Sequence, residues 1–185
     1  VADPSVTFTQ KSLNDDTYVK DAEDVVVWQG TVRANDVEDL VIRSLEYDNA
    51  GTADDSDVDQ YSFYKKEGNV VTAIETATTP ETGGATVVFP DLDEDGTSGL
   101  MVPAGEEFEI FVTADVASNP TPGNDIILSL DVSEIDVEDE DGDDATVTNG
   151  GDVASGATFT LQAKGALTVT LDNNTPDATI VIAGT

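Results

Sequence analysis

The chain has 185 residues, of which 39 are Asp or Glu and 7 are Lys or Arg, so its formal net charge is −32. Nucleic acids and anionic membrane surfaces are disfavoured as partners, because both would repel this charge. The absence of Cys and His excludes disulfides, thiol chemistry and the commonest general base.

The apolar residues follow the two-residue period of β-strands. In residues 107–116, for example, Phe108 and Ile110 alternate with Glu107 and Glu109. No stretch shows a helical stripe or the roughly 20 consecutive apolar residues of a membrane span. We therefore predict an all-β fold, an antiparallel β-sandwich or jelly roll, without membrane insertion. Short runs rich in Val, Ile, Thr and Phe predict its other strands at residues 6–9, 25–32, 40–47, 58–64, 70–74, 85–89, 126–132, 145–148, 157–163, 167–171 and 179–183.

The C-terminal residues repeat a pattern found at the N-terminus. Residues 166–185 contain a Thr-alternating strand, an Asn-rich turn and a second apolar strand, and residues 5–27 have the same order. We divide the chain into an acidic β-sandwich module, residues 1–164, and a terminal hairpin, residues 165–185. The hairpin supplies either the last strands of the sandwich or a strand shared with the next copy. Such strand exchange gives main-chain hydrogen bonds and covers a sheet edge that would otherwise aggregate.

The aromatic residues lie in two settings. Trp28 lies within an apolar run and is predicted to pack in the core. Residues 61–64 include three aromatics and are followed by Lys65 and Lys66, the only basic pair in the chain. We predict an edge strand here. One alternative is a glycan-binding platform formed by the aromatic residues Tyr18, Trp28, Tyr47, Tyr61, Phe63 and Tyr64. Another is a basic patch at Lys65 and Lys66 that meets an acidic surface of another copy.

One acidic loop has the spacing of a calcium site. Asp91, Asp93 and Asp95, followed by Gly96, match the first half of the loop D-x-D-x-D-G, in which alternate carboxylates converge on one hard cation. The position of the bidentate Glu of an EF-hand is occupied by Val102, and the loop follows a predicted strand instead of a helix. We therefore predict a calcium site in a β-loop, with a solvated acidic turn as the alternative.

Two further acidic clusters are candidate calcium sites. Residues 134–144 hold eight acids in eleven positions, and neighbouring carboxylates repel each other by about 1 kcal/mol per pair even in bulk water. A divalent counter-ion would order this run, whereas without one it would be a mobile loop; a saline medium would explain the acidity without any metal. The predicted ligands are Asp136, Glu138, Asp139, Asp141 and Asp143 in this cluster, and Asp55, Asp57 and Asp59 in residues 54–59.

No catalytic constellation stands out from the sequence. Nucleophilic triads need a base, which this chain lacks apart from its carboxylates and lysines. A two-carboxylate glycosidase pair is not diagnostic among 39 acids. The two Gly-Gly pairs lack the Lys and helix start of a phosphate-binding loop. We therefore predict that the chain is not an enzyme.

Two segments carry a pattern of sandwich repeats. Residues 102–116 combine a Pro-Ala-Gly turn, a strand and the sequence Ala-Asp-Val; residues 167–185 combine Leu-Thr-Val-Thr-Leu, Asn-Thr-Pro and Ala-Gly-Thr. These segments resemble the β-sandwich repeats of prokaryotic surface-layer-type proteins. The acidic sandwich also resembles the calcium-dependent subunits of extracellular tubules called cannulae, which join by strand donation. Both resemblances imply modules linked end to end and stiffened by calcium.

These patterns together predict a secreted structural protein of the cell surface. The chain begins at Val1, as expected of a processed or excised form. Its expected partners are copies of itself, in a homopolymer or tandem array that forms a surface layer, filament or tubule with calcium as cofactor. The alternative function is that of a secreted adhesin or carbohydrate-binding module with glycans as partners.

Overall fold

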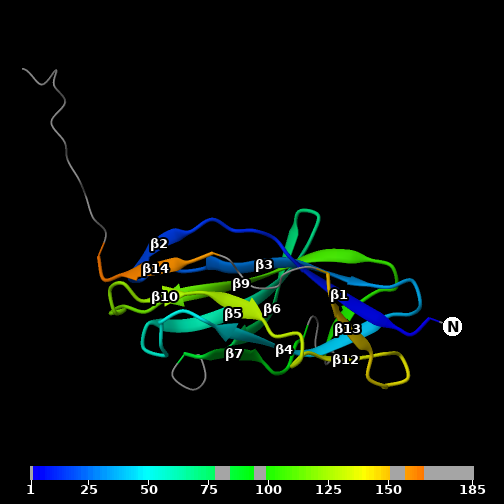
Figure 1. The fold of residues 1–185 in the computed structure, drawn as a ribbon. Helices are drawn as coiled ribbons and strands as arrows, with labels where there is room; N and C mark the ends of the chain where they lie inside the picture. The colour runs from blue at the N-terminus through cyan, green and yellow to red at the C-terminus, as the bar shows by residue number, and fades with distance from the viewer. Residues whose placement is uncertain (1, 78–83, 94–98, 151–156, 165–185) are drawn as a thin grey trace, which may run out of the picture.

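The structure, a computed structural model, describes residues 2–77, 84–93, 99–150 and 157–164. These residues form fourteen strands, which confirms the predicted all-β fold (Figure 1). Within this part of the chain, no helix has the length and apolar character needed to cross a membrane. The strands are β1 (Ser5–Gln10), β2 (Asp16–Val19), β3 (Val25–Ala34), β4 (Leu40–Asn49), β5 (Val58–Glu67), β6 (Val70–Ala77), β7 (Thr86–Phe89), β8 (Leu100–Val102), β9 (Glu107–Val116), β10 (Asp125–Ile126), β11 (Leu128–Leu130), β12 (Asp136–Glu138), β13 (Thr146–Asn149) and β14 (Phe159–Gln162).

The strands form a sandwich of two main sheets. One layer contains six strands in the order β13-β1-β3-β9-β5-β6. In the other layer β4 is central: β8 and β12 pair with its first half, and β7 and β11 pair with its second half. A small third sheet, in the order β10-β14-β2, lies at one end of the molecule (Figure 1).

A chain of aromatic rings joins the two layers. Trp28 of β3 meets Tyr47 of β4 edge to face, with ring centroids 5.1 Å apart. Tyr47 in turn contacts Phe89 of β7 at 6.0 Å, and Phe89 contacts Phe63 of β5 at 5.5 Å. All four side chains are fully buried, and each large apolar side chain of this kind contributes about 1.5–3 kcal/mol when buried. The prediction that Trp28 packs in the core is therefore confirmed.

Two strand pairs are parallel, whereas the other paired strands are antiparallel. β1 runs parallel to β13, with Ser5 opposite Thr146, and β14 runs parallel to β2, with Phe159 opposite Asp16. The beginning of β1 lies at one end of the elongated molecule, and β14 lies at the opposite end (Figure 1). The described chain therefore enters and leaves the sandwich at opposite ends.

Most predicted strands are present, with three differences. β2 and β8 were not predicted: β8 has only three residues, too few for an alternating pattern, and β2 has no fully buried residue to mark one. The run at residues 126–132 is split, because the chain passes from the sheet of β14 to that of β4, and the amide of Ile127 donates to Oδ1 of Asn49 instead. The prediction of an edge strand at residues 61–64 is wrong, since β5 lies between β9 and β6. The predicted strands at residues 167–171 and 179–183, and with them the terminal hairpin, lie outside the described residues.

Candidate functional site

The acidic turn between β12 and β13 is ordered by one of its own carboxylates. Oδ1 of Asp139 accepts hydrogen bonds from the amides of Asp141 and Asp143 at 3.0 and 2.9 Å. The amide of Gly142 donates to the carbonyl of Asp139 at 3.1 Å, and Gly142 has a φ of 82°, which L side chains rarely adopt. A local turn of this kind is the ordinary way in which Asp side chains organise a loop. The turn therefore has an ordered backbone held by Asp139.

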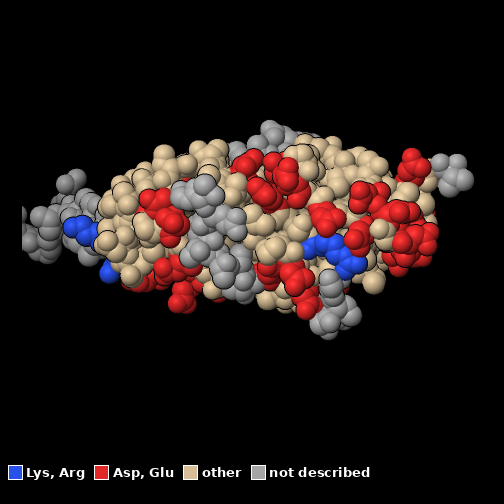
Figure 2. Space-filling model, turned by 90° about the horizontal axis from the view of Figure 1, so that it is seen from below, with Lys and Arg blue, Asp and Glu red and all other residues tan. Residues whose placement is uncertain are grey.

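The negative charge of the turn affects the pKa of Glu38, a surface carboxylate outside it. Partial desolvation, followed by the charges of Asp139, Glu140 and Asp141, raises the pKa of Glu38. Figure 2 views the molecule from below Figure 1 and shows acidic side chains spread over this face, with basic side chains at only a few places. This part of the surface therefore carries a strong negative potential.

The remaining ligands predicted in this cluster do not converge. Glu138 is paired with Arg43, whose Nε and Nη2 lie 2.8 and 2.7 Å from Oε2 of Glu138. Asp136, Asp141 and Asp143 are exposed. Across the described residues, no group of three or more acidic side chains is placed to hold one metal ion. Calcium binding by this cluster therefore stays a prediction.

Asp57 is a structural anchor between two turns. Its Oδ1 accepts a hydrogen bond from the amide of Thr121 at 2.6 Å, and its Oδ2 accepts from the amide of Asp54 at 3.0 Å and from Nδ2 of Asn124 at 2.7 Å. Burial opposes ionisation, but these hydrogen bonds outweigh it and hold the pKa of Asp57 below its usual range. The side chain is fully buried. Both of its oxygens are therefore engaged within the protein.

Sequence reasoning grouped Asp57 with Asp55 and Asp59 as calcium ligands, but the structure separates these three side chains. Asp55 and Asp59 are exposed, whereas Asp57 is buried. The sequence does carry a signal for a turn before Asp57, namely Asp54 followed two residues later by Ser56. In the structure, Oδ1 of Asp54 accepts hydrogen bonds from the amide and hydroxyl of Ser56, at 2.8 and 2.6 Å. A turn closed by Asp and Ser side chains needs no metal.

The loop after β7 brings a predicted ligand beside an unpredicted one. Asp91 and Asp93 are exposed there, and Asp95 lies outside the described residues. Desolvation raises the pKa of Glu75 on β6, and the negative charge of Asp91 adds to this, although the Asp91 amide donates a hydrogen bond to Glu75. Oε2 of Glu75 is buried without a hydrogen-bond partner among the described residues. Sequence reasoning missed Glu75, because it stands on a different strand.

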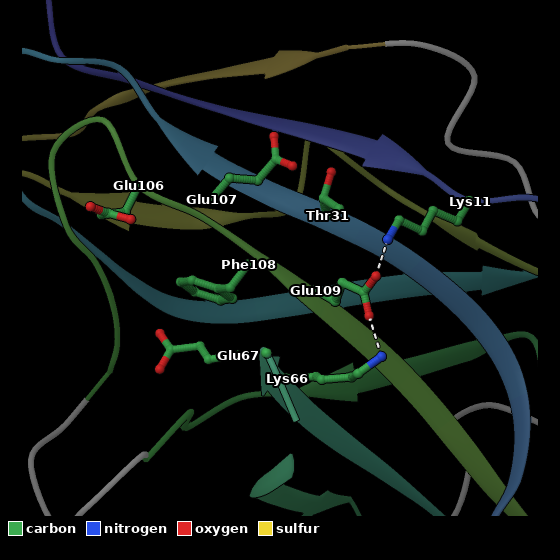
Figure 3. A pocket seen from close by; sticks show the side chains of 9 residues that line it. Lys11, Thr31, Lys66, Glu67, Glu106, Glu107, Phe108 and Glu109 are labelled. Carbon is green, nitrogen blue, oxygen red and sulfur yellow. Dashed lines mark hydrogen bonds and ion pairs between the residues drawn. The ribbon is translucent and has the colours of Figure 1, made fainter. Parts of the chain in front are cut away.

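An open hollow of about 400 Å³ lies on the outer face of the six-stranded sheet (Figure 3). Within it, Nζ of Lys11 donates to Oε1 of Glu109, and Nζ of Lys66 donates to Oε2 of Glu109 at 2.7 Å. These hydrogen bonds lower the pKa of Glu109 to about 2. Because Lys11 follows β1 and the other two residues lie on β9 and β5, the ion pairs tie three parts of the sheet together.

The two adjacent lysines of β5 point to opposite faces of the sheet. Lys66 points outward into the hollow, whereas Lys65 points inward, where its Nζ lies 4.4 Å from the ring centroid of Phe108 and 3.1 Å from Oε1 of Glu67. The side chain of Lys65 is buried. The alternative interpretation of these residues as one basic patch is therefore wrong, because successive residues of a strand face opposite sides.

The outer face of the same sheet carries a stacked aromatic pair. The rings of Tyr64 on β5 and Phe111 on β9 lie 5.1 Å apart at an interplanar angle of 9°. The hydroxyl of Tyr64 donates to Oδ1 of Asp24 at 3.3 Å, and desolvation, followed by the charge of Asp24, raises its pKa. Both rings are half-buried. This pair is the feature of the described chain that best fits a glycan platform.

The two edge strands of the six-stranded sheet are β13 and β6, and β6 is the longer of them. In the described chain β6 pairs with β5 alone. Val70 and Val71 are 66% and 51% exposed at its beginning, and Glu75 is its only charged residue. Natural edge strands are usually protected by charges, Pro or short length. β6 has eight residues and no Pro, so it presents a long, nearly neutral edge on a strongly acidic molecule.

Comparison with solved structures supports the fold. The chain is similar to part of the Hadza microbial sialidase Hz136, with a TM-score of 0.51 and 14% identity over 83% of this chain. It spans only 31% of the length of that sialidase. At this identity the similarity extends to the fold and not to the activity.

Weaker similarities are found to the protein CaCohA2. Its solution structure from Clostridium acetobutylicum gives a TM-score of 0.34 and 14% identity over 88% of this chain and 94% of that chain. The crystal structure of the CaDoc0917(R16D)–CaCohA2 complex gives 0.39 and 12% over 85% and 99%. These TM-scores are too low to support an argument. No protein-family model and no curated protein matches the chain, so its resemblance to surface-layer repeats and cannulae stays a prediction.

Proposed function

We propose that this chain is a non-catalytic, calcium-stabilised β-sandwich subunit of an extracellular structural assembly, in which copies join by strand donation at the free edge of β6. The observation that carries the proposal is the exposed, nearly neutral edge that β6 presents. An added strand would satisfy the free backbone groups of β6 and cover Val70 and Val71.

The donor that fits this edge best is the C-terminal segment of a neighbouring copy. Residues 166–171 and 178–183 are rich in Thr, Val, Ile and Leu and carry no charge, so a strand from either would meet β6 without repulsion. The acidic loops elsewhere on the surface disfavour other faces for contact between copies, because like charges repel.

Calcium would act at the loop after β7. Glu75, whose Oε2 is buried without a partner among the described residues, lies beside Asp91, and these two carboxylates offer hard oxygen ligands of the kind that Ca²⁺ prefers. Because the described residues place no third acidic side chain with them, backbone carbonyls and water would complete the site. Binding would relieve the charge repulsion between Glu75 and Asp91. Because an ion that binds only the folded state stabilises it by mass action, calcium would strengthen both the subunit and its assemblies.

The assembly is tested by electron microscopy of the purified chain with calcium and with chelator. We expect filaments, tubes or sheets with calcium. Deletion of residues 165–185 should leave a folded core that no longer assembles, and a truncated form that still polymerises would show that the tail is not the donor.

The acceptor edge is tested by V70K/V71K, which adds two positive charges at β6 and should abolish assembly. The matched control is V37K/M101K, which adds the same charge at two other exposed apolar residues, 40% and 51% exposed. This control should still assemble. Assembly by V70K/V71K, or its loss only in the control, would place the contact on a different surface.

A second candidate function is glycan binding at the Tyr64–Phe111 pair. Half-exposed aromatic rings on a sheet face offer a stacking surface for sugars. Persistent monomers with calcium that bind neutral glycans, and that lose binding in Y64A, would favour this function over the structural one.

A further inference from the structure

We infer that the sandwich is a load-bearing clamp: tension between its N-terminal and C-terminal ends is resisted by β1 and β14 in shear. The inference rests on strand topology and on the contacts of the terminal strands, and it is independent of calcium and of the strand donation proposed above. It begins from the finding that the described chain enters at one end of the molecule, with β1, and leaves at the other, with β14 (Figure 1).

The two terminal strands of the described chain both lie inside their sheets. β1 pairs with β13 on one side and with β3 on the other. β14 likewise lies between β2 and β10. Neither strand can therefore peel away from an edge, and each must break ladders on both of its sides to leave.

A pull on the two ends of the described chain acts along the axes of β1 and β14. A pull on the N-terminal end draws β1 along its own axis, out from between β13 and β3. A pull on the C-terminal end draws β14 along its axis in the opposite direction. Backbone hydrogen bonds run across the strands, so such a load is shared by a whole ladder at once.

The ladder of β1 and β13 has ties that extend beyond the strands themselves. The amide of Thr146 donates to the carbonyl of Pro4 at 3.1 Å, and the amide of Gly150 donates to the carbonyl of Phe8 at 2.8 Å. The hydroxyls of Thr7 and Thr148 are hydrogen-bonded at 2.6 Å. Inward from these contacts, the side chains of Val6 and Phe8 are fully buried, so sliding β1 also exposes apolar surface to water.

A different pulling direction on the same ladder provides the control. Ser5 and Thr146 begin their strands at the same end of the parallel pair. A force that separates residue 2 from residue 141 therefore opens β1 and β13 from that end, one hydrogen bond at a time. The chain has no Cys, so two introduced cysteines define the attachment points without ambiguity.

The experiment is single-molecule force spectroscopy on the full chain, comparing A2C/K164C with A2C/D141C at the same loading rate. All three positions are exposed, and equal melting temperatures would confirm that only the pulling direction differs. We expect the unfolding force of A2C/K164C to be higher by about twofold or more, because forced unfolding reports the unfolding barrier and that barrier includes a whole ladder. An equal or lower force for A2C/K164C would overturn the inference.

Discussion

Nδ2 of Asn124 donates a hydrogen bond to Oδ2 of Asp57 at 2.7 Å, so the turn before β10 is tied to the turn before β5. The same carboxylate also holds the amides of Thr121 and Asp54. A single buried carboxylate therefore accepts hydrogen bonds from two backbone amides and from the side-chain amide of Asn124.

Removal of this carboxylate should be costly. We expect D57A to lower the free energy of unfolding by about 3 kcal/mol, because it leaves buried donors unsatisfied and removes charge-assisted hydrogen bonds. Urea denaturation measures the change. The matched control, D55A, alters an exposed carboxylate in the same turn and should change stability by less than about 0.5 kcal/mol. Similar losses in both variants would show that Asp57 is not the anchor.

Stability should pass through a maximum in mildly acidic solution. The pKa values of Glu38 and Glu75 are raised above the usual 4.5, so protonation of these groups stabilises the fold as pH falls toward 4.5. The pKa of Glu109 is lowered from 4.5 to about 2, and that of Asp57 is lowered from 3.8, so their contributions are lost below pH 4.5 and 3.8 respectively.

Melting temperature measured at constant low salt should therefore rise from pH 7 to about pH 5 and fall at lower pH. In E38Q the rise should be smaller, because one of the responsible groups is absent. A melting temperature that falls steadily from pH 7 downward would contradict the raised pKa values of Glu38 and Glu75.

The Arg43–Glu138 pair should contribute more to stability than the other arginine pair. Both partners are about one-third exposed, 33% and 30%, and lie 2.7 Å apart, whereas Arg33 and Asp36 are 54% and 84% exposed and 3.8 Å apart. We expect R43M to cost about 1–2 kcal/mol in the free energy of unfolding and R33M to cost less than about 0.5 kcal/mol. Equal costs would show that the closer geometry of the first pair contributes nothing.

The fold class was largely predictable, because apolar residues that are buried alternate along the strands with polar residues that are less buried. The alternation across β9 identifies the buried side chains Phe108, Ile110 and Val112 directly. The order of the strands was not predictable. Nothing local to residues 61–64 shows that β9 will pair with β5 on the side opposite β6, since that pairing joins residues about fifty positions apart.

The candidate sites were less predictable, for a physical reason. Acidic spacing indicates only which carboxylates could converge. An Asp side chain can instead accept a hydrogen bond from an amide of its own turn, as Asp139 does from Asp141 and Asp57 does from Asp54. Partners from other strands carry no local signal either. Arg43 reaches Glu138 across 95 positions. Glu75 lies beside Asp91 because β6 contacts β7, and Asp91 is in the loop that follows β7.

Calcium should raise the melting temperature through Glu75. Its Oε2 is buried without a partner in the described chain, and an oxygen in that state is destabilising unless an ion or a donor satisfies it. We expect millimolar calcium to raise the melting temperature of the wild-type chain in low salt, and magnesium to do so less, because Mg²⁺ gives up its water reluctantly.

E75Q should be more stable than the wild type without calcium, since it removes the repulsion from Asp91, but should respond less to calcium. The control E67Q, on the neighbouring strand, changes the net charge by the same amount as E75Q. Its melting temperature should respond to calcium as that of the wild type does. A response that is the same in E75Q, or that sodium chloride reproduces at equal ionic strength, would point to charge screening instead of a bound ion.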